Sequence, residues 1–230
     1  MLTRSDETVV DCLEVWDVIE RVGLRHAGFK DVGVDIATLG ELNRRMQFSG
    51  VTTFLEVVST TVEDCLRSAR IGVEIGVDRL MGGTQVDEIL PLLAGTGIAY
   101  LPFPGVPIGH PTVLGGSAET VEMHCKAFDA IGCAGADLLA YRAVDADPIE
   151  LVRAARRGTQ GYLVVAGSVS TVEQVDDLAD AGADAFTIGS AVFDGSFSPR
   201  KGSIVSQLRD VMDACSSSES RPPGRAVVPE

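Results

Sequence analysis

The 230-residue sequence predicts an α/β fold in which strands and helices alternate, and two observations lead to this prediction. First, a glycine followed by a short apolar run recurs at intervals of 21 to 38 residues. The glycines that open these runs are Gly23, Gly50, Gly76, Gly97, Gly135, Gly161 and Gly182. Second, the stretches between the runs, such as TTVEDCLRSARIGVEI and STVEQVDDLADA, have helical periodicity. Continuous apolar runs that alternate with amphipathic helices are typical of buried parallel strands.

The order of the elements predicts a (β/α)8 TIM barrel, with an open doubly wound sheet as the alternative. Seven strands follow the seven glycines, and each helical stretch is expected to begin at Ser, Thr or Asp and to end at the next glycine. An eighth strand is needed before the helix TVVDCLEVWDVIERV, and residues 1–4 (MLTR) are the only candidate. We therefore expect the barrel to span residues 1–215. The polar, aperiodic residues 216–230 (SSSESRPPGRAVVPE) are expected to form a disordered tail.

Composition limits the classes of partner. The chain is 45% hydrophobic and 23% charged, which suits one domain with a large core, and its formal net charge is −14. An acidic surface repels phosphate backbones and anionic lipids, so neither nucleic acid nor a membrane is an expected partner. Five cysteines without a CxxC pair, no secretory leader and no apolar run of 18 residues predict a cytoplasmic protein. The sequence leaves open whether the barrel forms a homo-oligomer.

Polar residues gather where the predicted strands end, which is the end of a barrel that carries active sites. Counting from each glycine places Lys30, Glu56, Tyr141 and Arg142 at this rim. The alternative is that some of these side chains only face water at the loops. As a group, they contain an amine, a carboxylate, a phenol and a guanidinium, which together suffice for chemistry at a carbonyl carbon.

The segment 164–195 predicts a phosphate site. Gly167 and Ser168 follow one strand, and Gly189 and Ser190 follow the next. Backbone N–H groups at such turns and at helix N-termini bind anions, and in barrels these two loops are the usual phosphate site. The alternative is that the glycines only permit tight turns.

Three functions fit these residues. The first is a carbon–carbon lyase or condensing synthase acting on a small phosphorylated carbonyl compound: Lys30 forms a Schiff base, Glu56 moves protons, and Tyr141 or Arg142 stabilises an oxygen. The second is a cofactor-free sugar-phosphate isomerase or epimerase, in which Lys30 stays an ammonium and Glu56 enolises the substrate. The third is a non-catalytic barrel that binds a phosphorylated metabolite.

The pattern AGSV…AGADAFTIGSA resembles the C-terminal quarter of the phosphate-binding TIM-barrel superfamily, which includes thiamine phosphate synthase, N-acylmannosamine-6-phosphate epimerase and the histidine-pathway barrels. The resemblance covers roughly residues 161–195 and implies a phosphate site without implying a reaction. A narrower resemblance is to (5-formylfuran-3-yl)methyl phosphate synthase, a barrel that condenses triose phosphates through a Schiff-base lysine seven residues after a glycine. This resemblance implies that Lys30 forms the imine. The chain departs from that family at DRLMGGT, where Arg79 stands and the family's second rim lysine is missing.

The remaining features bear on cofactors and on one further acid or base. His110 lies in the Gly/Pro-rich connection 102–116, where it would act as an acid or base or remain a surface residue. Three scattered histidines without HExxH predict no dedicated metal site, and the absence of GxGxxG argues against a dehydrogenase. We therefore expect no cofactor, although Mg²⁺ held by a substrate phosphate and a flavin on the phosphate loops stay open.

Overall fold

The computed structural model describes residues 1–59, 61–109 and 111–219, and seven of its strands form two parallel sheets. One sheet has the order β3 (His26–Lys30), β4 (Thr52–Val57), β5 (Arg79–Gly82) and β6 (Ala99–Leu101). The other contains β9 (Gly135–Leu138), β10 (Tyr162–Val165) and β11 (Ala185–Phe186). Each of the seven predicted runs contains one of these strands, so the alternation read from the glycines is confirmed.

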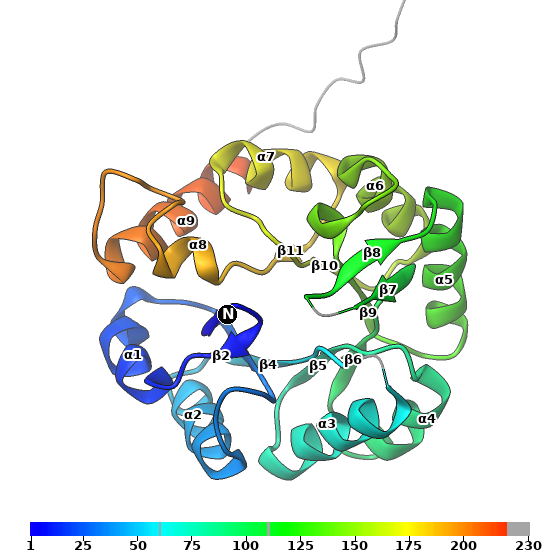
Figure 1. The fold of residues 1–230 in the computed structure, drawn as a ribbon, viewed down its shortest axis with the longest axis horizontal. Helices are drawn as coiled ribbons and strands as arrows, with labels where there is room; N and C mark the ends of the chain where they lie inside the picture. The colour runs from blue at the N-terminus through cyan, green and yellow to red at the C-terminus, as the bar shows by residue number, and fades with distance from the viewer. Residues whose placement is uncertain (60, 110, 220–230) are drawn as a thin grey trace, which may run out of the picture.

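The two sheets are arranged as parts of one barrel-like ring, with helices outside it (Figure 1). The N–H of Ala134 donates to the carbonyl of Tyr100 (2.9 Å), and the N–H of Asp137 donates to that of Pro102 (3.0 Å), which joins the β9 side to the β6 side. At the opposite edges, the N–H of Leu2 donates to the carbonyl of Gly28 (2.7 Å). The fold is thus mixed α/β: short parallel strands form the ring, and the helices lie outside it.

The N-terminal segment differs from the predicted strand over residues 1–4. Only Thr3–Arg4 form a strand, β1, and it pairs antiparallel with β2 (Glu7–Thr8) in a hairpin. The turn is made by Ser5 and Asp6, both with a positive φ (51° and 64°). The residues before the hairpin lie between β3 and β11, because the Met1 amino group donates to the carbonyl of Ile188 at 2.8 Å.

The helices lie between the strands in the predicted order. They are α1 (Cys12–Ile19), α2 (Ile36–Phe48), α3 (Val62–Ile75), α4 (Val86–Leu93), α5 (Ala118–Ala130), α6 (Pro148–Gly158), α7 (Val172–Ala181), α8 (Ser190–Phe193) and α9 (Ile204–Glu219), with 3-10 turns η1 (Glu20–Val22) and η2 (Ala140–Arg142). Side-chain caps begin five of them, from Asp35, Thr61, Ser117, Asp147 and Thr171. These caps stand directly before amphipathic stretches, as the sequence predicted.

The C-terminal helix corrects the boundary expected at residue 215. Helix α9 continues to Glu219, so the first four residues of the predicted tail are helical, and residues 220–230 lie outside the described part of the chain. The serines that suggested a tail are accommodated in the helix: the hydroxyls of Ser216 and Ser217 donate to the carbonyls of Met212 and Asp213. None of the helices in the described ranges is long and apolar enough to cross a membrane.

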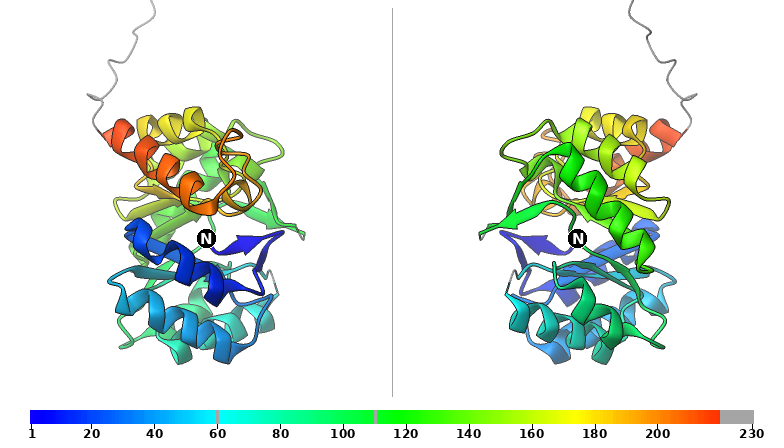
Figure 2. Two further views of the ribbon diagram at one scale, coloured as in Figure 1. Left: turned by 90° about the vertical axis from the view of Figure 1, so that its left-hand side faces the viewer. Right: turned by 90° about the vertical axis from the view of Figure 1, so that its right-hand side faces the viewer.

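The Gly/Pro-rich connection after β6 is partly ordered as a second hairpin. Strands β7 (Val106–Ile108) and β8 (Val113–Gly115) pair antiparallel. This hairpin and the β1–β2 hairpin project from the same side of the ring (Figure 2). They therefore flank the end at which the parallel strands stop.

The interior of the ring is apolar below that end. Phe54, Met81, Leu101 and Val164 form a buried cluster inside the ring, and a larger core lies between the strands and the helices. A cavity of about 530 Å³, mostly apolar, is lined by residues of β11, α9 and β3 and by Phe54, Met81 and Val164 of the cluster. Packing is thus loosest along the seam between β11 and β3.

Candidate functional site

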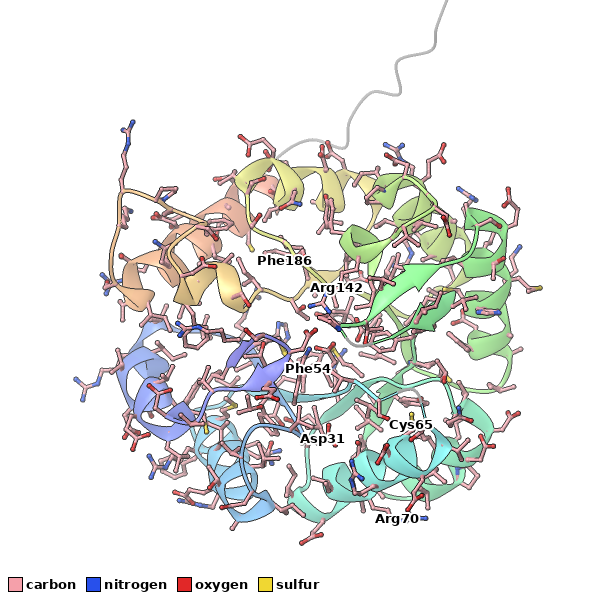
Figure 3. All side chains as sticks on the ribbon, viewed as in Figure 1. Asp31, Phe54, Cys65, Arg70, Arg142 and Phe186 are labelled. Carbon is pink, nitrogen blue, oxygen red and sulfur yellow. The ribbon has the colours of Figure 1, made fainter. Side chains whose placement is uncertain are left out.

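A cavity of about 270 Å³ opens at the carboxyl ends of the parallel strands. Its lining brings together seven of the nine predicted site residues: Lys30, Glu56, Arg142, Gly167, Ser168, Gly189 and Ser190. Figure 3 shows Arg142 toward the middle of the ring. The residues come from both sheets, so the fold joins groups that are up to 160 positions apart in the sequence.

Lys30 is the central cation of this cavity. It ends β3, is 3% exposed, and stands in register with Glu56 at the end of β4. Partners in register on neighbouring strands place their side chains on the same face of the sheet. The Lys30 Nζ lies 2.8 Å from Asp6 Oδ1 and 3.5 Å from Glu56 Oε1. Thr8 fixes the backbone at this point, because its hydroxyl donates to the Lys30 carbonyl and accepts from the Lys30 N–H.

Asp6 is a site residue that the sequence reasoning missed. Its two oxygens accept hydrogen bonds from Arg142 Nη1 (2.9 Å) and Nη2 (2.8 Å), and one of them also accepts from Lys30. Burial opposes ionisation of the Asp6 carboxyl, but the bonds from Arg142 and Lys30 outweigh burial and hold its pKa well below the ordinary value. No periodic pattern marks Asp6, because the β1–β2 turn is what delivers it.

Arg142 reaches the cavity from the η2 turn rather than from a strand end, since β9 stops at Leu138. Its side chain lies against Gly167, where an added Cβ would be 2.8 Å from the Arg142 Cγ. Gly167 also has a φ of +90°. Two independent constraints therefore require glycine at this position: the backbone angle and the close approach of Arg142.

The structure does not bring the other two predicted residues into the cavity. Tyr141 precedes Arg142 in the η2 turn but packs half-buried against the main core, outside the cavity lining. Burial raises the pKa of its phenol, and the charges of Asp177 and Asp147 add to this. Counting residues from a glycine to the strand end cannot show which of Tyr141 and Arg142 faces the cavity, because a tight turn directs consecutive side chains differently. His110 lies outside the described residues.

The two glycine loops offer backbone donors to this cavity. Among the described residues, no hydrogen bond uses the backbone N–H of Gly167, Ser168 or Gly189. Ser168 has a φ of +60°, unusual for a residue with a side chain. Successive N–H groups in such turns form anion-binding concavities. The carboxylate of Asp194 also lines the cavity and opposes an anion there.

Asp137 is the second residue that the sequence reasoning missed. It lies on β9 and is 0% exposed, and neither of its carboxyl oxygens has a hydrogen-bond partner within the described ranges. Burial raises the pKa of this carboxyl well above its ordinary value; the charge of Glu56 raises it further and that of Lys30 lowers it. A signal was present in the sequence, because an aspartate interrupts the apolar run GADLLAYR.

A metal centre finds no support in the described ranges. They contain no group of three or more His, Cys, Asp or Glu side chains placed to hold a metal ion. Their five cysteines are free thiols.

Comparison with known proteins places the fold. No family model matches the chain, and no curated protein sequence matches it. Solved structures do match, among them the Amycolatopsis orientalis BexX/CysO complex, with a TM-score of 0.64, 20% identity and coverage of 97% of this chain and 92% of that one. Orotidine 5'-phosphate decarboxylase from Pyrococcus horikoshii OT3 matches with a TM-score of 0.63, 14% identity and coverage of 89% and 92%. (S)-3-O-geranylgeranylglyceryl phosphate synthase from Thermoplasma acidophilum, in complex with its substrate sn-glycerol-1-phosphate, matches with a TM-score of 0.60, 15% identity and coverage of 90% and 87%. At these identities the likeness concerns the fold alone.

Proposed function

We propose that this chain is a (β/α)8-barrel enzyme that forms a Schiff base between Lys30 and a small phosphorylated carbonyl compound, as a carbon–carbon lyase or condensing synthase. One observation carries the proposal: a buried lysine amine and a carboxylate share one cavity with two glycine loops whose backbone N–H groups make no hydrogen bond to any described residue. Two of the similar structures are enzymes named for phosphorylated compounds, which supports this substrate class.

The barrel part of the proposal assigns the N-terminal residues to the eighth wall position. Leu2 bonds to Gly28 of β3, and Met1 bonds to Ile188 just after β11. These two bonds bridge the gap between the sheets on one side, as the β6–β9 bonds do on the other. The similar folds of the solved structures agree with this assignment.

In this proposal, one side of the cavity binds the phosphate and the other side reacts with the carbonyl group. The loops at Gly167–Ser168 and Gly189–Ser190 would hold the phosphate through their N–H groups. Lys30 would attack the carbonyl carbon after passing a proton to Glu56, whose Oε1 lies 3.5 Å from the Lys30 Nζ. Arg142 would hold an oxygen of the substrate or product, since its guanidinium stays charged.

Reductive trapping tests the proposal. The protein is incubated with a panel of phosphorylated aldehydes and ketones, reduced with borohydride, and mapped by peptide mass spectrometry. The chain has three lysines, Lys30, Lys126 and Lys201, and the last two are largely exposed, so they report non-specific labelling in the same sample. We expect one compound to label Lys30 alone.

Lys30→Arg is the matched control, because it keeps the cation beside Asp6 and Glu56 but cannot form an imine. Loss of the adduct in this variant, with phosphate-ester binding retained, would support the mechanism. Binding of several compounds without any label on Lys30 would contradict it.

One observation favours a second candidate, a cofactor-free isomerase or epimerase. The Lys30 Nζ is ion-paired to Asp6 and lies 3.5 Å from Glu56 Oε1, which places a cation beside a carboxylate base. An ammonium would polarise a carbonyl while Glu56 removes a neighbouring proton. Deuterium exchange from solvent into a substrate carbon, persisting in Lys30→Arg while no imine is trapped, would favour this candidate.

A further inference from the structure

Asp137 is buried beneath the reactive pair of the cavity. It stands in register with Val164, which belongs to the apolar cluster inside the ring, so Asp137 faces the same interior. Glu56 is two residues after Phe54 of that cluster and therefore faces it as well. Leu139, two residues after Asp137, lines the cavity itself. The Asp137 carboxyl thus lies just below the cavity floor, where the charges of Glu56 and Lys30 act on it.

A carboxyl in this position is not explained by packing or by structure-building hydrogen bonds. Its surroundings include the apolar cluster, and neither oxygen has a partner among the described residues. An isolated buried carboxylate is so costly that the group keeps its proton instead. Asp6 differs: it is partly buried and is ionised because two cations bond to it.

We propose that Asp137 holds a proton for the Lys30–Glu56 pair and supplies it during imine formation. This inference rests on the proposed Schiff-base function. Because no part of Asp137 is exposed to the cavity, it acts through Glu56 and Lys30 and is a positioning residue.

The proton balance of imine formation gives this residue its role. When a lysine ammonium and a carbonyl become an iminium and water, two protons pass from the nitrogen to the oxygen. Glu56 as a carboxylate receives the first proton from Nζ, and the amine attacks the carbonyl carbon. Glu56 gives this proton to the developing alkoxide, and Asp137 replaces it on Glu56. Glu56 then protonates the hydroxyl, water leaves as the second nitrogen proton passes to Glu56, and Glu56 returns that proton to Asp137, so both carboxyls are back in their starting states.

Infrared spectroscopy tests whether Asp137 holds a proton in the resting protein. At neutral pH, the wild type should show the carbonyl stretch of a protonated carboxylic acid, and Asp137→Asn should lose it. Glu56→Gln should keep the band. Asp31→Asn is the matched control, because burial also raises the pKa of Asp31 and its side chain bonds to Ser68 away from the cavity. Absence of the band in Asp31→Asn, or its survival at unchanged intensity in Asp137→Asn, would overturn the proposal.

Trapping kinetics test what the proton does. With the compound that labels Lys30, Asp137→Asn should trap about 100-fold more slowly at saturation, since general acid–base groups contribute on this order or more. Half-saturation should change little, and the fall of the wild-type rate at alkaline pH should vanish. Asp31→Asn should trap at the wild-type rate. Equal rates and the same alkaline limb in Asp137→Asn would overturn the role.

The two failures are distinguishable. If wild-type Lys30 forms no imine with any compound, the proposed function fails and this inference fails with it. If Lys30 is labelled but Asp137→Asn behaves as the wild type, only the inference fails. Should Asp137→Asn not fold, the band that remains in an Asp31→Asn, Glu56→Gln double variant reports the protonation of Asp137 directly, and its absence overturns the proposal.

Discussion

The two halves of the ring are built differently. Strands β3 to β6 form an unbroken parallel ladder whose inner residues are buried, and this half supplies Lys30 and Glu56 at registered positions. The half with β9 to β11 ends in a two-residue strand, residues 185–189 are each partly exposed, and the 530 Å³ cavity adjoins it. For the proposed function, the β3–β6 half places Lys30 and Glu56 on neighbouring strands, whereas the half with β9 to β11 supplies Arg142, Asp137 and the glycine turns.

The largest test of this comparison is a matched pair of core truncations. Leu55→Ala, in the β3–β6 half, removes a fully buried side chain and should lower the free energy of unfolding by about 2–5 kcal/mol. Phe186→Ala, in the half with β9 to β11, should lower it by less than Leu55→Ala, because Phe186 is partly exposed and already borders a cavity. Denaturant titration measures both. A larger loss for Phe186→Ala would contradict the difference in packing.

The second test removes the carboxylate that joins the halves. Asp6→Asn leaves Lys30 and Arg142 without their shared anion and should destabilise the protein by about 2 kcal/mol at neutral pH. Because the pKa of Asp6 is lowered in the folded state, its stabilisation is present above its unfolded pKa and is lost as the pH falls toward the folded value. The wild type should therefore lose stability below about pH 4 more steeply than Asp6→Asn.

Asp11→Asn is the control for Asp6→Asn. Asp11 is exposed at the start of α1 and makes no side-chain cap, so its replacement should leave both the neutral-pH stability and the acid limb unchanged. Equal acid sensitivity of the wild type and Asp6→Asn would show that Asp6 does not couple the halves.

The third test concerns the contact between Arg142 and the first glycine loop. Gly167→Ala adds a Cβ 2.8 Å from the Arg142 Cγ at a φ of +90°. Gly97→Ala has a similar φ of +81° but no atom within 4 Å, so it isolates the cost of the backbone angle, about 1–2 kcal/mol. We expect Gly167→Ala to cost more than Gly97→Ala and to weaken phosphate-ester binding, which Gly97→Ala leaves intact. Calorimetry measures both, and equal effects would contradict the contact.

Sequence periodicity was sufficient for the repeating part of the fold, and its failures have physical causes. Each apolar run after a glycine contains a strand, because burial on both faces requires such a run. The prediction over residues 1–4 was wrong for Thr3 and Arg4, which turn away from the ring into a hairpin that Ser5 and Asp6 close with positive φ angles. Local sequence carries little information about this turn, since neither residue is glycine.

The same distinction holds for the site. Lys30, Glu56 and the glycine loops follow from strand ends, a regular feature of a repeating fold. Asp6 does not, because it enters the site through a turn and is defined by contact with Arg142, which is 136 positions away. Asp137 was overlooked for another reason: attention to strand ends passes over a polar residue in the middle of an apolar run.

The smallest expected effect concerns Asp194, which puts a negative charge on the β9–β11 side of the cavity. Hydrogen bonds from the Ser196 hydroxyl and from the Ser196 N–H (2.9 Å) lower the pKa of its carboxyl, so it is charged at neutral pH. Asp194→Asn keeps the size of the side chain and removes the charge. If the loops bind phosphate through backbone N–H groups, affinity for a phosphate ester should rise about two- to five-fold at low salt, because unit charges a few ångströms apart interact by roughly 1 kcal/mol in water. The gain should shrink at high salt, where exposed charges are screened.

Asp176→Asn, on α7 and outside the cavity lining, should leave the affinity for the phosphate ester unchanged. A fall in affinity on Asp194→Asn would indicate that the phosphate binds away from the glycine loops, and would contradict the assignment of phosphate binding to the half with β9 to β11.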